Sequence, residues 1–195
     1  MAKSVEFFFD FGSPAAYLAF TQIRKIAERT GAELVWRPFL LGAVMQAAGN
    51  RSPIECAAKG KWMIGDLARF AKRYGVEFNM NPHFPINTLP LMRGAIVAQE
   101  DGVIDRYAEA IYQAIWVDGK NMADPPTIGA VLTAADLDAA HFMDAIQSQK
   151  VKDKLKANTE EAVERGAFGA PTYFVDGEMH FGQDRLNFVE EALAA

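Results

Sequence analysis

The sequence predicts an α/β fold in which a β-α-β segment and a β-β-α segment are separated by a large all-helical insertion. Three observations predict it. An aromatic-rich segment with period-2 alternation opens the chain, helical periodicity fills the middle, and two short strand-like segments joined by Asp-Gly lie near the end.

The first strand is expected over residues 5–11, where apolar side chains recur at every second position and the pattern stops near Gly12. Ser13 and Pro14 follow, and these residue types are favoured at the N-cap and first position of a helix. The serine oxygen accepts an orphan backbone N–H, whereas proline has no N–H to lose. A helix is therefore expected from Pro14 to about Arg29.

The second strand is expected over residues 34–39, after the helix has ended at Gly31. Its sequence LVWRPF is rich in β-branched and aromatic residues and is closed by proline. This β-α-β order predicts two parallel strands joined by a right-handed crossover.

The middle of the chain, residues 41–165, changes to helical periodicity. Turn residues such as Gly49-Asn50, Gly75 and Asp124-Pro125-Pro126 divide it into segments. The predicted helices cover residues 55–74, 89–99, 104–115, 139–149 and 152–165.

The end of the chain returns to strand character at residues 172–175. Asp176-Gly177 then leads into residues 178–181, which is a strong signal for a two-residue hairpin. A final helix is expected after Gln183-Asp184. The whole order is that of the thioredoxin fold interrupted by a helical block.

Length and composition fit this arrangement. A chain of 195 residues, half of them hydrophobic, is long enough for one core that carries a large insertion. We expect a discontinuous thioredoxin-like domain formed by residues 1–40 and 167–195, with residues 41–166 as an inserted helical domain.

Charge and hydropathy exclude several classes of partner. The net charge of -5 leaves no basic face for nucleic acid. No apolar run reaches the roughly 18 residues of a membrane span, and no secretory leader is expected. A soluble, cytoplasmic protein is expected.

Cysteine and histidine content limits the chemistry further. Cys56 is the only cysteine, so the chain has no intrachain disulfide, no thiolate-rich metal site and no dithiol redox couple. Cys56 itself is expected to be an inert, buried thiol. His83, His141 and His180 lie far apart without metal-ligand spacing, and no metal is expected.

Three motifs together resemble the 2-hydroxychromene-2-carboxylate isomerase family, which is related to the kappa-class glutathione transferases and the DsbA-type thiol oxidoreductases. The resemblance covers nearly the whole chain. The motifs are FDFGSPAAYLA at residues 9–19, GAPTYF at residues 169–174 and FGQDRL at residues 181–186.

The resemblance implies that Ser13 is the catalytic residue. In the thiol oxidoreductases a C-x-x-C motif stands where this chain has Ser13-Pro14-Ala15-Ala16. A serine cannot form a disulfide, but its hydroxyl donates a hydrogen bond to a thiolate brought by glutathione, and the positive end of the helix dipole favours the same ionised sulfur. Local sequence alone favours the plainer interpretation, in which Ser13 is only an N-cap.

The second and third motifs imply the rest of the glutathione site. The Ala170-Pro171 bond is implied to be cis, which frees the Ala170 backbone to pair with the cysteinyl part of glutathione. Phe181 and Gly182 precede Gln183-Asp184, which is implied to hold the γ-glutamyl end at the start of the last helix. An ordinary proline at a strand start and a plain Asp cap are the alternatives.

The insertion supplies further candidates through the same resemblance. Asn50 and Lys59 share their spacing with glutathione contacts of the kappa-class relatives, and Lys59 would pair with the glycyl carboxylate. Asp66 resembles a residue that crosses the dimer interface in those relatives, so a homodimer is implied. Asn87 and Thr88 are implied to line the substrate pocket, although they could equally form an N-cap pair.

The activity implied is glutathione-dependent cis-trans isomerisation of 2-hydroxychromene-2-carboxylate, or a similar small aromatic carboxylate, to trans-o-hydroxybenzylidenepyruvate. Glutathione is then a recycled cofactor. One alternative is a kappa-like transferase or peroxidase that consumes glutathione. Another is a redox-inactive thioredoxin-like protein that binds peptides or partners. Trp62, Trp116 and Phe39 are aromatic but receive no role, because such residues at helical spacing usually belong to the core.

Overall fold

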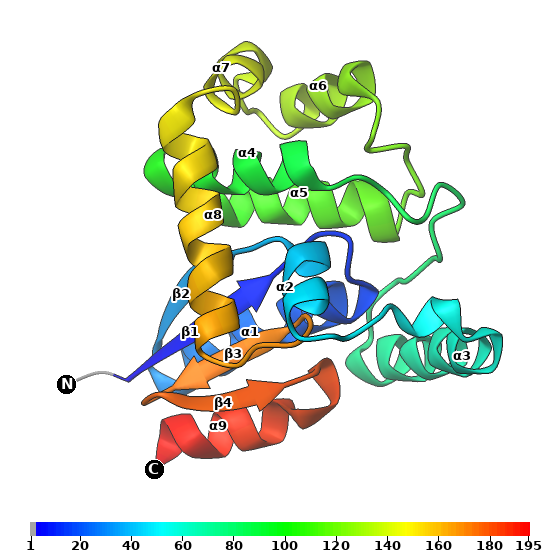
Figure 1. Cartoon of the computed structure of the whole chain (residues 1–195), viewed down its shortest axis with the longest axis vertical. Coiled ribbons are helices and arrows are strands. Elements are labelled where there is room, and N and C mark those ends of the chain that lie inside the picture. The colour runs from blue at the N-terminus through cyan, green and yellow to red at the C-terminus, as the bar shows by residue number, and fades with distance from the viewer. Residues whose placement is uncertain (1–2) are drawn as a thin grey trace.

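A computed structural model describes residues 3–195 and places a four-stranded mixed sheet at the centre of the protein (Figure 1). The order across the sheet is β2-β1-β3-β4. Strands β1 and β2 are parallel, whereas β3 is antiparallel to both β1 and β4. The predicted thioredoxin-like arrangement is confirmed. The strands are β1 (Ser4–Phe9), β2 (Glu33–Pro38), β3 (Thr172–Val175) and β4 (Glu178–Phe181).

The two faces of β1 explain its alternating sequence. Phe7 and Phe9 stack against each other and meet Trp36 at tilted or edge-on angles, on the side where Phe20 of α1 (Pro14–Thr30) also meets Trp36. Phe8 points to the opposite side, as the pleat of a strand requires. Both faces are therefore buried, and this strand lies at the heart of the core.

Local signals at the ends of elements are also confirmed. Gly31 ends α1 with a left-handed φ of 66°. Asp176 and Gly177 both have positive φ, 49° and 85°, as the predicted two-residue hairpin between β3 and β4 demands. The last helix, α9 (Leu186–Ala194), packs against α1 and β3 and follows the 3-10 turn η2 (Gln183–Arg185).

The regular elements of the insertion are all helices, but several details differ from the prediction. Asp124-Pro125-Pro126 is the start of a helix and not a break, because the Asp124 side chain caps Thr127 and proline occupies the first position. A short helix also follows β2, where none was predicted. The elements are α2 (Leu41–Ala47), η1 (Pro53–Glu55), α3 (Ala57–Tyr74), α4 (Leu89–Glu100), α5 (Ile104–Trp116), α6 (Pro125–Ala134), α7 (Ala139–Ala145) and α8 (Gln149–Glu164).

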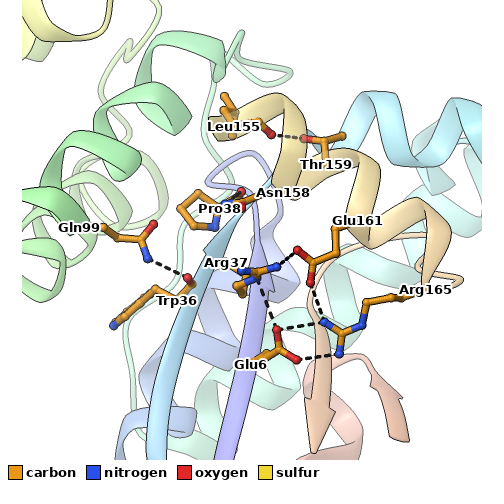
Figure 2. Close-up of polar contacts among 10 residues, drawn as sticks. All are labelled: Glu6, Trp36, Arg37, Pro38, Gln99, Leu155, Asn158, Thr159, Glu161 and Arg165. Atoms are coloured by element: carbon orange, nitrogen blue, oxygen red, sulfur yellow. Dashed lines mark hydrogen bonds and ion pairs between the residues drawn. The ribbon is translucent and has the colours of Figure 1, made fainter. Parts of the chain in front are cut away.

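A polar network joins α8 to the sheet, as Figure 2 shows. Arg165 pairs with Glu6 of β1 at 2.7 Å and with Glu161 of α8 at 3.0 Å. Arg37 of β2 pairs with the same two carboxylates. Arg165 also lies 3.6 Å above the ring of Phe174. The insertion is thereby held against the sheet by partly buried charges on the face opposite α1.

Within residues 3–195 no helix is both long and apolar enough to cross a membrane. In Figure 1 the helices of the insertion lie in several places, and α8 runs along the sheet. Helices α4 to α7 form a group beyond one end of the sheet, and α3 projects to one side. The division into two domains at residues 41 and 166 stays a prediction.

Candidate functional site

The ends of β1 and β3 meet at one edge of the sheet. Phe8 pairs with Thr172 in the antiparallel register, so the residues that follow β1 lie beside the residues that precede β3. The hairpin brings the end of β4 to the same place, where the Gly182 N–H donates to the Pro171 carbonyl at 3.0 Å. Sheet topology alone therefore gathers the three sequence motifs.

A cleft of about 860 Å³ opens at this edge. Its floor is formed by residues 12–15, 169–170 and 182–184, which come from the three motifs. Its rim is formed by residues within the range 45–67, from the end of α2 into α3. Among the described residues the cleft contains nine of the residues singled out from sequence. They are Ser13, Asn50, Lys59, Asp66, Ala170, Phe181, Gly182, Gln183 and Asp184.

Ser13 is both a helix cap and part of the floor of the cleft. Its Oγ accepts a hydrogen bond from the Ala16 N–H at 3.1 Å, which makes it the N-cap of α1. The same hydroxyl donates to the Ala170 carbonyl at 3.0 Å. Its side chain is almost fully buried, at 5% exposure, and it faces the cleft from the positive end of the helix. The two interpretations of Ser13 are thus compatible.

The Ala170–Pro171 peptide bond is cis, as the resemblance implies. Only part of the expectation for Ala170 is confirmed. Its carbonyl is not free, because it accepts the Ser13 hydroxyl, whereas its N–H makes no hydrogen bond within residues 3–195. Pro171 is buried and is not among the described residues that line the cleft.

The third motif forms a tight turn and not the first turn of an α-helix. Gly182 has φ 92° and ψ 152°, a conformation available almost only to glycine. Gln183 is buried, and its carbonyl accepts the Tyr74 hydroxyl of α3 at 2.6 Å. Asp184 is exposed and pairs with Arg185 at 2.8 Å. The α-helix itself begins only at Leu186.

The rim carries the candidates from the insertion. The Asn50 side chain donates to the Phe168 carbonyl at 2.8 Å and so ties the rim to the segment before β3. Lys59 is exposed on the first turn of α3 and has no ion pair within residues 3–195. Asp66 is partly buried, lies 3.5 Å from Arg69 of the same helix and lines the cleft of its own chain.

The walls of the cleft are largely apolar. Trp62 is 64% exposed, which is exceptional for tryptophan, and it lines the cleft rather than the core. Trp116 and Phe39, by contrast, are fully buried. Apolar and aromatic residues that complete the lining are Leu41, Met45, Met63, Leu67, Phe84, Phe168 and Phe181.

Asp10 is a buried residue of this region that sequence reasoning missed. Its carboxylate accepts hydrogen bonds from the Gly12 N–H at 2.8 Å, the Leu41 N–H at 3.0 Å and the Thr88 hydroxyl at 2.7 Å. Burial raises the pKa of the Asp10 carboxyl above its ordinary value of 3.8, and the three donors partly oppose that rise. Asp10 therefore joins the turn before Ser13 to the starts of α2 and α4.

One expectation about a side chain, that Cys56 is buried, is wrong, whereas the substrate-pocket roles of Asn87 and Thr88 stay predictions. Thr88 and Asn87 do not appear among the described residues lining the cleft: Thr88 holds Asp10, and Asn87 caps the Leu89 N–H at 3.2 Å. Cys56 is exposed at the start of α3 and lines the rim, so it is not a buried thiol.

The three histidines lie in different parts of the structure. His83 and His141 are exposed, and His141 pairs with Asp101 at 2.9 Å. His180 lies on β4. Within residues 3–195 no group of three His, Cys, Asp or Glu side chains is placed to hold a metal ion.

Comparison with known proteins agrees with this geometry. The family model described as a DSBA-like thioredoxin domain matches residues 4–194. A 2-hydroxychromene-2-carboxylate isomerase from Sphingobium xenophagum is 32% identical over 195 residues, covering 99% of each chain. Glutathione S-transferase kappa 1 from Homo sapiens is 27% identical over 211 residues, covering 99% of this chain and 92% of that protein.

Solved structures give the same relationship. A structure of a 2-hydroxychromene-2-carboxylate isomerase superposes with a TM-score of 0.88 at 28% identity, covering 97% of this chain and 94% of the other. The likeness extends over both the sheet and the insertion, because almost all of each chain is matched. The chain belongs to the DsbA-like thioredoxin-domain proteins and, among these, to the 2-hydroxychromene-2-carboxylate isomerase family.

Proposed function

We propose that the protein is a glutathione-dependent cis-trans isomerase of 2-hydroxychromene-2-carboxylate or a closely similar aromatic carboxylate. The observation that carries the proposal is the position of Ser13. It caps α1 at the edge of the cleft, where thiol oxidoreductases of this fold have their first cysteine, and the only cysteine of the chain lies elsewhere. The sulfur needed for chemistry at Ser13 then has to come from a ligand.

The polar groups of the floor fit glutathione. The Ala170 N–H is a backbone donor without a partner in the described residues, and the carbonyl beside it is held only by the Ser13 hydroxyl. A peptide backbone presents both a donor and an acceptor to such a pair. The turn at Gly182, Gln183 and Asp184 offers a matching site for the γ-glutamyl end, and Lys59 for the glycyl carboxylate.

Glutathione, when bound, supplies a thiolate that adds reversibly to the substrate, so that a double bond becomes a single bond about which rotation occurs. The Ser13 hydroxyl has one proton and so serves one acceptor at a time. We expect it to leave the Ala170 carbonyl and donate to the sulfur, which frees that carbonyl to accept from glutathione. The first turn of α1 adds its dipole, and both effects favour the ionised sulfur near neutral pH.

The walls of the cleft suit an aromatic substrate. Trp62, Phe84 and Phe181 present aromatic side chains to the cleft, and burial of a flat ring against such surfaces is favourable. A cleft of about 860 Å³ has the size of a site for a small organic molecule. We expect it to hold glutathione and a bicyclic carboxylate together.

The decisive experiment follows the ultraviolet spectrum of 2-hydroxychromene-2-carboxylate with the protein, with and without glutathione. Conversion to trans-o-hydroxybenzylidenepyruvate that requires glutathione, without net loss of glutathione, is the expected result. Absence of conversion at saturating glutathione would refute the isomerase proposal.

A kappa-like transferase is the second candidate, because the human relative at 27% identity is named glutathione S-transferase kappa 1. The two functions differ in their products. A product with glutathione covalently attached, detected by mass spectrometry, would replace the isomerase proposal with the transferase.

A further inference from the structure

The charged side chains of the cleft differ in whether they have partners. Each of the three carboxylates has one: Asp66 lies near Arg69, Asp184 pairs with Arg185, and the Glu55 carboxylate accepts the Ser52 N–H at 3.3 Å. The two cations that line the cleft, Arg51 and Lys59, have no ion pair within residues 3–195. Within residues 3–195 the cleft therefore leaves two cations, Arg51 and Lys59, and one carboxylate, Glu55, without an ion pair.

Glutathione accounts for only one of these two cations. This step rests on the proposed function. The sulfur is matched by Ser13, the γ-glutamyl end by the turn at residues 182–184, and the glycyl carboxylate by Lys59. Arg51 then remains without a counterpart, although it lines the same cleft.

Arg51 is suited to bind a second carboxylate. Its backbone is fixed, because its N–H donates to the Asn50 side chain at 2.8 Å, and Asn50 in turn holds the Phe168 carbonyl. Its side chain is exposed. A guanidinium is planar and binds a carboxylate through two parallel hydrogen bonds, and it is always charged at neutral pH.

Because the guanidinium of Arg51 lines the cleft without an ion pair in the described residues, we infer that Arg51 determines substrate specificity by binding the carboxylate of the aromatic substrate. The apolar walls hold the ring of the substrate, and Arg51 selects anionic rings over neutral ones. A neutral electrophile of the same shape gains the contact with the walls but leaves Arg51 without a partner.

The test compares chromone-2-carboxylate with chromone, two compounds with the same flat ring system of which only the first carries a charged group. Binding is measured by quenching of the fluorescence of Trp62, which lines the cleft while Trp116 and Trp36 are buried. The cofactor site is first saturated with ophthalmic acid, a glutathione analogue that carries a methyl group in place of the thiol. We expect the wild-type protein to bind the carboxylate at least about tenfold more tightly than chromone, as one charge-assisted pair provides.

Three variants test whether Arg51 is the source of the preference for the carboxylate. Arg51→Gln is expected to lose the preference while its affinity for chromone and for ophthalmic acid stays unchanged. Lys59→Gln is expected to weaken ophthalmic acid binding and keep the preference. Arg73→Gln is the matched control, because Arg73 is exposed on α3 and is not among the described residues lining the cleft.

Equal binding of the two rings by the wild-type protein, or a preference that survives in Arg51→Gln, would overturn the inference. Failure of the proposed function is seen separately, in the isomerisation assay and in the affinity for ophthalmic acid. The preference between the two rings does not depend on turnover, so the role of Arg51 is judged on its own measurement.

Discussion

The floor and the rim of the cleft are built in different ways. In the floor Ser13 and Gln183 are buried and hydrogen-bonded to groups from distant parts of the chain. In the rim Arg51 and Lys59 are exposed and face solvent without ion pairs in the described residues. A fixed floor suits a chemical step that needs one geometry, whereas a solvated rim adapts to the ligand and selects it by charge.

The largest expected effect tests the floor. Ser13→Ala removes the hydroxyl that caps α1 and bonds Ala170, and we expect a loss of about 100-fold in kcat/KM, as when one donor to a developing or bound anion is removed. The free energy of unfolding should fall by only about 1 kcal/mol, the usual cost of a lost cap. Isomerisation kinetics and urea denaturation measure the two effects.

The matched control for this variant is Ser148→Ala. Ser148 also caps a helix, since its Oγ accepts the Val151 N–H at the start of α8, but it lies outside the cleft lining among the described residues. It should lose similar stability and keep full activity. Equal activity losses in the two variants would show that Ser13 acts only as a cap.

An intermediate effect is expected at the turn that closes the floor. In Gly182→Ala the new Cβ would lie 2.5 Å from the Asp184 carboxylate, in addition to the strain of a φ of 92°. Gly177→Ala has comparable φ, 85°, but its Cβ meets nothing within 4 Å. Both variants should lose about 1–3 kcal/mol of stability through backbone strain.

Only Gly182→Ala should also raise the KM for glutathione, several-fold, because Asp184 has to move. Thermal denaturation and initial rates at varied glutathione concentration separate strain from binding. An unchanged KM in Gly182→Ala would exclude the turn from the cofactor site.

The smallest effect is expected at Asp10, the buried carboxyl that lies under the floor of the cleft. Because burial raises the pKa of Asp10 above 3.8, the folded protein holds that proton to a higher pH than the unfolded chain does. The stabilisation by protonated Asp10 is therefore present at low pH and is lost as the pH rises from about 4 through the raised pKa.

The measurement is the free energy of unfolding of wild type and Asp10→Asn between about pH 4 and pH 7. The stability of wild type relative to Asp10→Asn should fall as the pH rises, because asparagine does not titrate. Asp144→Asn, at an exposed carboxylate on α7, is the control for general charge effects. A difference that stays constant or grows with pH contradicts the role given to Asp10.

Local features of the fold were predictable from the sequence. The cap at Ser13, the C-terminal stop at Gly31 and the Asp176-Gly177 hairpin each depend on a few neighbouring residues. The start of α6 was missed although it is also local. Asp124-Pro125-Pro126 suits a turn and a helix N-terminus equally, and only the continuation decides between them.

Features that depend on distant contacts were not predictable in this way. In the sequence Asp10 looks like one more residue of the first strand. Its role becomes visible only in the folded structure, where Leu41, 31 residues away, and Thr88, 78 residues away, donate hydrogen bonds to its carboxylate. The exposure of Cys56 likewise depends on how α3 projects from the body of the protein (Figure 1). The three motifs that carry the family resemblance do meet at one cleft, because they lie at strand ends that the topology brings together.

The exposed position of Cys56 has a practical consequence for the study of this protein. It is the single cysteine of 195 residues, and it lies on the rim beside the cations that face the cleft. A thiol-reactive fluorophore or spin label will therefore attach at one defined point of the natural chain without mutagenesis. Such a reporter senses the occupancy of the cleft directly, independently of whether any ligand is turned over.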